Sequence, residues 1–406
     1  MRFVTRLIAP AALWLMAASA AQGEALTDIL RNAALKNGLR PAAQLFDDTD
    51  AHLAEFGRAF FESRHVSLNG NISCRNCHLD RFSSADGLPN AVGVLGKGKG
   101  AERALSDGRI VPRNTLPLWG RGAHGFETFF WDGKVDFANG KRISQFGEAA
   151  PSPDPFVTAV HLPPLEIREM LSDGPDIARY KRESPSSASV LYGRIVDVLN
   201  REERQAIERL ARALGKPASQ IEFIDVARSI AAFIRTEFAL RDTKLHGFVF
   251  GRETLTPEEL KGGLLFYGKG KCSTCHTGPY FSDFEFYAVP FPQLGFGKNG
   301  FGVDYGRFNV TFNPGDLYKF RTPPLFNVTR TAPYGHAGSL PDLKSAIVTH
   351  FDPLRSIDST EMDAIARHEQ FKRMAAVGDD YLLLSVLSDD EVELIGQFLT
   401  SLEFDP

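Results

Sequence analysis

Cys74-Arg75-Asn76-Cys77-His78 and Cys272-Ser273-Thr274-Cys275-His276 are the stretches that decide this fold, because they contain every cysteine in the 406 residues. The pattern Cys-x-x-Cys-His is typical of covalent c-type haem attachment. Each thiol can add to one vinyl group of a porphyrin, and the histidine that follows can ligate its iron. The sequence therefore predicts two covalent haem c groups, one on each motif, and a redox function.

Three other interpretations of the motifs are weaker. A zinc ribbon keeps its two cysteine pairs about 15–20 residues apart, whereas these pairs lie in opposite halves of the chain. A thioredoxin-like site contains one such pair and needs no histidine after it. A disulfide within each motif would leave His78 and His276 unexplained.

The N-terminus has the features of a cleaved export signal. Arg2 and Arg6 are basic, Leu7 to Ala17 is apolar, and Ala18-Ser19-Ala20 provides the small residues of a cleavage site. The apolar run is shorter than the roughly 20 residues of a membrane-spanning helix. We therefore expect residues 1–20 to be a signal peptide and the mature protein to lie in the periplasm, where covalent haem attachment is feasible.

The composition limits the partners and the size of the core. A formal net charge of −4 argues against a nucleic-acid partner, and no basic run indicates a membrane surface. No later stretch is apolar enough to span a bilayer. Hydrophobic residues make up 43% of the chain, which allows a sizeable core in each half.

The neighbourhoods of the two motifs repeat. Residues 57–61 (Gly-Arg-Ala-Phe-Phe) align with residues 263–267 (Gly-Leu-Leu-Phe-Tyr), which pairs Gly57 with Gly263. Two related cytochrome c-like domains are the simplest explanation. We expect a mainly α fold with long ordered loops, an N-terminal domain over residues 21–245 and a C-terminal domain over residues 246–406.

Apolar spacing and capping signals predict the main helices. One helix should contain Leu53, Phe56 and Phe60, and another should cover residues 218–238. Thr256 with Glu259, and Ser388 with Glu391, form capping boxes that should begin two further helices. Residues 86–112 and 290–324 are rich in glycine and proline and should be loops.

The order of short motifs resembles the bacterial dihaem cytochrome c peroxidase family, which includes MauG. The matching segments cover nearly all of the predicted mature chain. They are residues 71–78, 112–114, 130–133, 272–278, 305–308, 320–323 and 331–336. The resemblance implies that peroxide reacts at the N-terminal haem, that the C-terminal haem transfers electrons, and that calcium binds between the domains.

On the peroxide side, the resemblance implies that His78 is the proximal ligand and Glu166 the acid–base catalyst, with Gln145 as a pocket glutamine. The chain lacks the second histidine that blocks this iron in ordinary members, so we expect an open site, with His124 as a rival ligand. Burial should raise the pKa of Glu166. Alternatively, Glu166 follows Pro163-Pro164 in the first turn of a helix and only stabilises it.

On the electron-transfer side, the resemblance implies that His276 is the proximal ligand and that a distal ligand follows on a later helix. His350 occupies that place, and Met362 and Met374 are the alternatives. Two histidines should give a lower reduction potential than histidine with methionine. The resemblance also places Arg321 near haem propionates, which a guanidinium pairs with well.

The family resemblance implies two further features. Trp131 should lie between the haems and relay electrons, although a core tryptophan is the ordinary alternative. Calcium should be held by the side chain of Asn114 and the carbonyls of Thr331 and Pro333, in agreement with its preference for oxygen ligands.

Three functions follow as hypotheses. In the first, a small periplasmic cytochrome or copper protein supplies electrons for the reduction of hydrogen peroxide. In the second, the protein acts like MauG and uses peroxide to modify residues of a partner protein. In the third, it is a dihaem electron carrier without peroxide chemistry. Members of the family often form homodimers, which we keep as an expectation.

Overall fold

The computed structural model describes residues 9–46, 51–172, 174, 184–298, 302–378 and 386–405, and for residues 9–22 and 51 only the backbone. The predicted signal peptide therefore lies partly outside the described residues. None of the described helices combines the length and apolar character that a membrane span requires.

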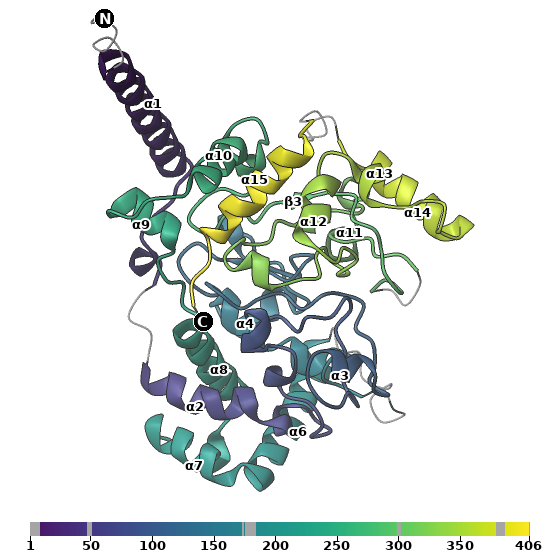
Figure 1. Cartoon of the computed structure of the whole chain (residues 1–406). Helices are drawn as coiled ribbons and strands as arrows, with labels where there is room; N and C mark the ends of the chain where they lie inside the picture. Colours follow the sequence, from purple (N-terminus) through teal and green to yellow (C-terminus); the bar gives the residue numbers. More distant parts are fainter. Residues whose placement is uncertain are drawn as a thin grey trace, which may run out of the picture.

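The protein is mainly α-helical with long irregular connections, as predicted (Figure 1). The helices are α1 (Ala9–Lys36), α2 (Ala51–Glu62), α3 (Ala101–Ala104), α4 (Pro155–Val160), α6 (Pro185–Glu202), α7 (Arg204–Ala213), α8 (Phe223–Glu237), α9 (Lys244–Phe250), α10 (Pro257–Tyr267), α11 (Phe308–Thr311), α12 (Leu343–Thr349), α13 (Pro353–Ser356), α14 (Ala364–Ala375) and α15 (Asp389–Thr400). The strands are β1 (Thr128–Phe129), β2 (Val135–Asp136), β3 (Phe286–Tyr287) and β4 (Phe320–Arg321).

The strands form two small antiparallel pairs. β1 pairs with β2, with Thr128 opposite Asp136, and this hairpin holds the segment that contains Trp131. β3 pairs with β4, with Phe286 opposite Arg321. The strands are too short to form a core, so the helices and the haem motifs organise the fold.

The predicted helix starts are largely confirmed. Thr256 accepts a hydrogen bond from the backbone N–H of Glu259 at the start of α10, and Ser388 does the same for Glu391 at the start of α15. The helix expected over residues 218–238 begins later, at Phe223. The side chain of Asp225 accepts a hydrogen bond from the backbone N–H of Glu222, which has extended backbone angles. This cap begins α8 as a helix separate from the 3-10 turn Ala218–Gln220 that precedes it.

Each half contains a closely packed helix pair beside its haem motif. In the first half α2 crosses α8, and in the second half α10 crosses α15. Gly57 of α2 approaches the backbone of Ser229 so closely that a Cβ there would overlap its carbonyl oxygen. Gly262 of α10 has the same relation to Leu394 of α15. Only glycine permits this approach of two helix backbones.

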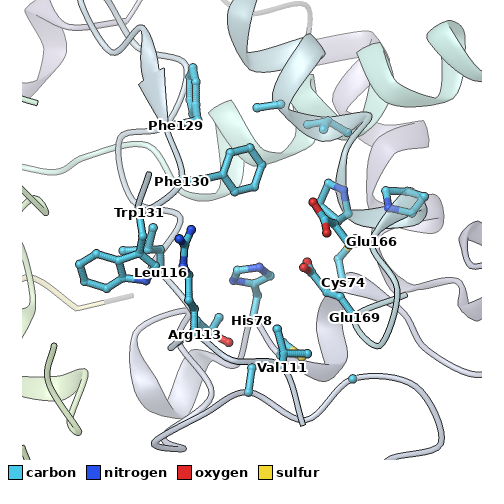
Figure 2. Close-up of a pocket in the computed structure, with 18 of the residues that line it drawn as sticks. Cys74, His78, Val111, Arg113, Leu116, Phe129, Phe130, Trp131, Glu166 and Glu169 are labelled. Atoms are coloured by element: carbon cyan, nitrogen blue, oxygen red, sulfur yellow. The ribbon is translucent and has the colours of Figure 1, made fainter. Parts of the chain in front are cut away.

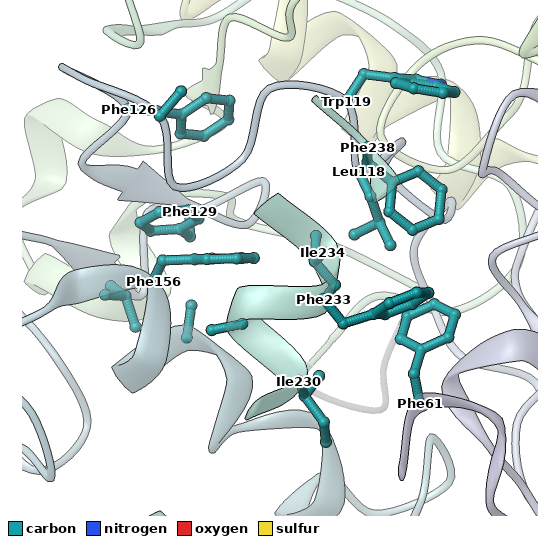
Figure 3. Packing of buried hydrophobic residues seen from close by; sticks show 14 of the residues in the cluster. Phe61, Leu118, Trp119, Phe126, Phe129, Phe156, Ile230, Phe233, Ile234 and Phe238 are labelled. Carbon is teal, nitrogen blue, oxygen red and sulfur yellow. The ribbon is translucent and has the colours of Figure 1, made fainter. Parts of the chain in front are cut away.

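The structure corrects the register of the internal repeat by one residue. Gly57 corresponds to Gly262, and the alignment of Gly57 with Gly263 is wrong. The aromatic contacts follow the same register, because Phe61 packs on Phe233 with ring centroids 5.1 Å apart and Phe266 packs on Phe398 at 5.2 Å. Figure 3 shows Phe61 and Phe233 in the core of the first half. The residues that each helix packs against, rather than the similarity of the adjacent sequence, decide which positions of the two halves are equivalent.

The first helix packs on the second half of the chain. Leu30 of α1 is fully buried and lies against Gly263 of α10, and Arg31 donates a hydrogen bond to the carbonyl of Phe248. Farther along, the backbone N–H of Gly278 donates to the carbonyl of Asn37. The segment before α2 therefore covers the second unit, and the boundary between residues 245 and 246 stays a prediction.

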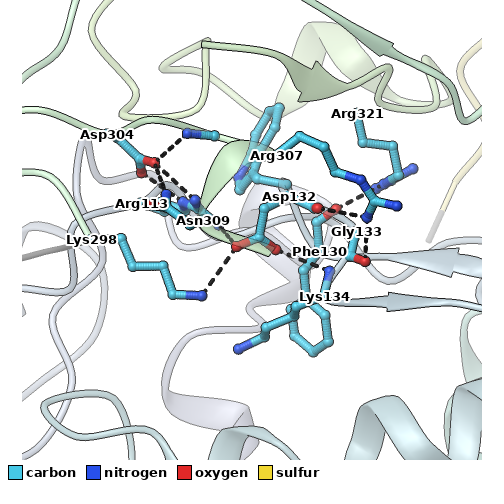
Figure 4. Close-up of polar contacts among 12 residues, drawn as sticks. Arg113, Phe130, Asp132, Gly133, Lys134, Lys298, Asp304, Arg307, Asn309 and Arg321 are labelled. Carbon is cyan, nitrogen blue, oxygen red and sulfur yellow. Dashed lines mark hydrogen bonds and ion pairs between the residues drawn. The ribbon is translucent and has the colours of Figure 1, made fainter. Parts of the chain in front are cut away.

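A network of buried ions joins the two halves (Figure 4). Arg113 contacts Asp132 at 2.7 Å and pairs with both carboxylate oxygens of Asp304, and Lys298 approaches Asp132 at 3.1 Å. Asp132 and Asp304 have no exposed side-chain surface. Burial opposes ionisation of Asp304, but Arg113 outweighs burial and lowers the pKa of this carboxyl to about 2. Both carboxylates therefore stay ionised and need their cations.

The glycine contact leads to a prediction about stability. Gly57→Ala should lower the free energy of unfolding by about 1–3 kcal/mol, because the new methyl group forces α2 away from α8. Gly193→Ala in α6 is the matched control, because a Cβ there meets open space. It should be neutral or stabilise the protein by up to about 1 kcal/mol. Urea unfolding followed by circular dichroism measures both, and equal effects of the two substitutions would contradict the packing argument.

Candidate functional site

The first haem motif lies at the wall of a cavity of about 560 Å³ (Figure 2). A short 3-10 turn, Cys74–Asn76, presents Cys74, Cys77 and His78 to this one space. Neither cysteine forms a disulfide. Phe61, Phe129 and other apolar side chains form much of the remaining wall. Two thiols beside one imidazole in an apolar cavity fit a covalently attached porphyrin.

The imidazole of His78 is oriented for metal binding. Its Nδ1–H donates a hydrogen bond of 2.7 Å to the carbonyl of Ser84, which leaves Nε2 available for a metal. Burial lowers the pKa of His78 to about 4, so the ring is neutral near pH 7. A neutral imidazole is the form that ligates iron.

No second histidine lines this cavity in the part of the chain that the structure describes. The rival ligand His124 lies elsewhere, at a separate cavity that also contains Asp154 and Arg235. Gln145 is also not among the residues that line the first cavity. It follows the β1–β2 hairpin and comes shortly after Ile143, which pairs with Asp136 of β2.

Glu166 does line the first cavity, but its environment differs from the prediction in two respects. It follows a 3-10 turn, Pro163–Leu165, and has extended backbone angles, so it is not in the first turn of a helix. Burial alone would raise its pKa, but an ion pair with Lys134 and the charge of Lys298 lower the pKa of Glu166 to about 2. The expectation of a raised pKa is therefore wrong, because the ammonium group of Lys134 lies within contact.

Sequence reasoning missed Glu169, Lys134 and Lys298, which line the same cavity. Burial is the main cause that raises the pKa of Glu169 to about 7, and Lys134 opposes it while Glu166 adds to it. A second glutamate three residues after Glu166 was the available signal. The lysines carried no local signal, because they come from distant segments of the chain.

The second motif lies at another cavity, of about 180 Å³. Cys272, Cys275 and His276 line it together with His350, which ends α12. The imidazole centroids of His276 and His350 are 6.3 Å apart. An iron atom bonded to one nitrogen of each ring would hold the centroids about 6 Å apart, given metal–nitrogen bonds of about 2 Å. The geometry thus fits ligation by two histidines.

Both histidines use Nδ1 to hold the ring in place. His276 donates from Nδ1 to the carbonyl of Phe281 at 3.0 Å, and His350 donates from Nδ1 to the carbonyl of Ala346 at 2.7 Å. Burial lowers the pKa of both, that of His276 to about 4. The alternative ligands Met362 and Met374 do not line this cavity.

Arg321 is buried at the wall of the second cavity with part of its guanidinium unsatisfied. Nε donates to the carbonyl of Phe130 and Nη1 to that of Thr322, whereas Nη2 has no hydrogen-bond partner among the described residues. Burial lowers the pKa of Arg321 well below its usual value. A buried cation with a free donor fits a carboxylate such as a haem propionate.

Trp131 lines both cavities. Its indole N–H donates a hydrogen bond of 2.9 Å to the carbonyl of Asn114, which fixes the ring. The backbone N–H of Arg321 donates to the carbonyl of Trp131, which ties this segment to the second half. The only tryptophan in either lining thus lies where the two cavities approach each other.

The residues proposed for calcium come from both halves and partly meet. The side-chain amide of Asn114 contacts the carbonyl of Pro333 with a nitrogen–oxygen distance of 2.6 Å, and the Thr331 hydroxyl donates to Val328. Among the described residues no group of three or more histidine, cysteine or acidic side chains could hold a metal ion. The calcium site proposed here would instead be built from carbonyl and amide oxygens.

Comparison with solved structures supports the fold. A MauG-like protein associated with microbial copper homeostasis superposes with a TM-score of 0.62 over 90% of this chain and 92% of its own, at 20% identity. The diheme peroxidase BthA from Burkholderia thailandensis also gives a TM-score of 0.62, over 90% and 89% of the two chains, at 18% identity. At these identities the likeness concerns the fold alone.

Sequence comparison identifies the family. The chain is 26% identical to cytochrome c551 peroxidase of Pseudomonas aeruginosa over 296 residues, which cover 72% of this chain and 70% of that protein. It is 26% identical to MauG of Paracoccus denitrificans over 326 residues, or 74% of each chain. The family model for di-haem cytochrome c peroxidase matches residues 51–253. The chain therefore belongs to the di-haem cytochrome c peroxidase family, which implies two haem c groups and makes it a haem-dependent oxidoreductase of the peroxidase type.

Proposed function

We propose that the protein reduces hydrogen peroxide in the periplasm with electrons from a small redox protein. The observation that carries this proposal is the difference between the two cavities. The first contains one histidine, His78, together with acidic and basic side chains that can move protons. The second contains His276 facing His350 and leaves no open position between the two rings.

In this proposal each residue has a defined role. When bound, the haem groups supply the redox chemistry. His78 would hold the iron that meets peroxide, and the pair His276 and His350 would hold the iron that receives electrons. Trp131, fixed between the cavities, would relay electrons, since the protein's role with such cofactors is to position and tune them.

The second candidate is oxidation of a partner protein in the manner proposed for MauG-like enzymes. Two observations favour it. Among the described residues, His78 is the only histidine at the first cavity, and the second cavity offers His350 where a methionine would be expected of a peroxidase. Both features would let the resting ferric protein react with peroxide without prior reduction.

Calcium between the halves is part of the proposal. Asn114 comes from the first half, and Thr331 and Pro333 come from the second. An ion bound by these oxygen atoms would fix the segment that supports the Trp131 indole, because Asn114 also accepts the indole N–H. Cleavage of a signal peptide over residues 1–20 and a homodimer stay predictions.

The histidine pair gives a spectroscopic prediction. His350→Met should raise the reduction potential of the second haem by part of the roughly 0.8 V range that axial ligands span, because a thioether replaces an imidazole. Met374→Leu is the control and should leave the potential unchanged. Potentiometric titration followed by visible absorption measures both. A shift in Met374→Leu, with none in His350→Met, would assign the ligand to methionine.

The peroxidase function gives a kinetic prediction. Trp131→Phe should lower the steady-state turnover of hydrogen peroxide with a reduced small cytochrome c by at least about tenfold, because the relay between the cavities is lost. Trp119→Phe is the matched control, since Trp119 is buried but lines neither cavity.

The same preparation separates the two candidate functions. A long-lived near-infrared charge-resonance band on adding peroxide to the ferric protein, with negligible turnover of the reduced donor, would favour oxidation of a partner protein. A ferric protein that does not react with peroxide, and shows no turnover after reduction, would reject both functions and leave the electron carrier.

A further inference from the structure

Two carboxyl groups enter the first cavity from one turn of the chain (Figure 2). The backbone N–H groups of Met170 and Leu171 both donate to the carbonyl of Glu166, at 3.1 and 3.0 Å. Arg168 has φ of 72°, the left-handed conformation that reverses the chain within this turn. As a result Glu166 and Glu169 point to the same space as His78. Arg168 also lines this cavity, and its guanidinium lies over the ring of Phe296.

Glu166 is held as a fixed anion. Its carboxylate forms an ion pair with Lys134, whose ammonium also lies 4.3 Å from the centroid of the Phe130 ring. The backbone of Lys134 is tied to Asp132, so the cation belongs to the buried ionic network between the halves. Lys298 of the same network adds a second positive charge. A carboxylate neutralised in this way holds a proton poorly at neutral pH.

Glu169 is in the opposite situation. Within the ranges that the structure describes, its carboxyl group makes no hydrogen bond and no ion pair with another side chain. Burial is the largest influence on it and raises its pKa to about 7, with Lys134 and Lys298 opposing the shift and Glu166 adding to it. The cavity is also lined by His78 and by three further cations, Arg113, Arg121 and Arg168. The sulfur atoms of Cys74 and Cys77 would be thioethers once haem is attached and would not titrate. Glu169 can therefore gain and lose a proton near pH 7.

We propose that Glu169 is the catalytic residue that carries the peroxide proton in the first cavity, and that the Glu166–Lys134 pair is a positioning element that sets its charge environment. This inference depends on the proposed peroxide chemistry. The family motif directs attention to Glu166, but the geometry gives Glu166 a permanent partner and leaves Glu169 free to exchange protons.

The proton balance is simple. The Glu169 carboxylate accepts one proton from the peroxide oxygen nearer to the iron and returns it to the far oxygen. The oxygen–oxygen bond then breaks, and the far oxygen leaves as water with both protons and the electron pair of that bond. The redox donor supplies two electrons and solvent supplies two protons, so that one peroxide becomes two water molecules overall.

The proton role predicts distinct pH profiles for the two glutamates. The reaction of ferric protein with hydrogen peroxide, measured by stopped-flow absorption, should speed up with rising pH through an apparent pKa near 7, because Glu169 must be ionised to accept the proton. Glu169→Gln should lose this dependence and react about 10²-fold or more slowly. Glu169→Asp should keep an ionisation in the pH profile but react with hydrogen peroxide more slowly than the wild type.

Glu166→Gln should behave differently. It removes a negative neighbour and leaves Lys134 without its partner, and both changes favour the carboxylate form of Glu169. The ionisation in the rate profile should therefore persist and move to lower pH. Glu148→Gln, at an exposed position outside the cavity, is the charge-matched control and should leave the profile of the wild type unchanged.

Infrared titration provides a readout that needs no peroxide. The carbonyl band of a protonated carboxyl group should disappear from the ferric protein across the same pH range, be lost in Glu169→Gln and persist in Glu166→Gln. The inference is overturned if Glu169→Gln keeps the band, or if it keeps the rate and pH profile of the wild type while Glu166→Gln loses them. A wild-type protein that does not react with peroxide in the ferric state and shows no turnover after reduction rejects the proposed function itself. A Glu169→Gln variant that reacts at the rate of the wild type rejects only the role of Glu169.

Discussion

The carboxylate of Asp132 is the interaction on which the rest of the site depends. It has no exposed surface and binds Arg113 from the first half and Lys298 from the second. A buried carboxylate without these cations would strongly destabilise the protein. The two halves must therefore keep the relative position that brings both cations to Asp132. Trp131 and Lys134 flank this residue in the chain. The ion network thereby fixes both the indole between the cavities and the ammonium that reaches into the first cavity.

The same cations account for the unlike behaviour of two similar side chains. Glu166 and Glu169 lie in one turn and line one cavity, so burial acts on both. Lys134 contacts Glu166 and only influences Glu169 from farther away. The result is one permanent anion beside one carboxyl that titrates near neutrality. When the surroundings of two acidic groups drive their pKa values apart, the group that stays ionised can stabilise charge, and the group that titrates near neutral pH can transfer protons.

The sequence correctly predicted those features of the structure that depend on contacts between residues close together in the chain. The haem motifs, the capping boxes at Thr256 and Ser388, and His350 at the end of a helix depend on neighbours a few residues away, and the structure contains all of them. Long-range contacts decided the rest. The register of the repeat depends on which helix crosses Gly57, and the pKa of Glu166 depends on Lys134 in the turn between β1 and β2.

The two cavities show why the family motif alone is an incomplete guide to the chemistry. Each presents two thiols and a histidine held through Nδ1, so the attachment of the cofactor is nearly the same in both. The difference lies in what faces that histidine. A second imidazole 6.3 Å away suits an iron that only changes its charge, because no position is left for a substrate. Acidic and basic groups at the other cavity suit an iron whose ligand must gain and lose protons, and these groups come from segments that the motif does not contain.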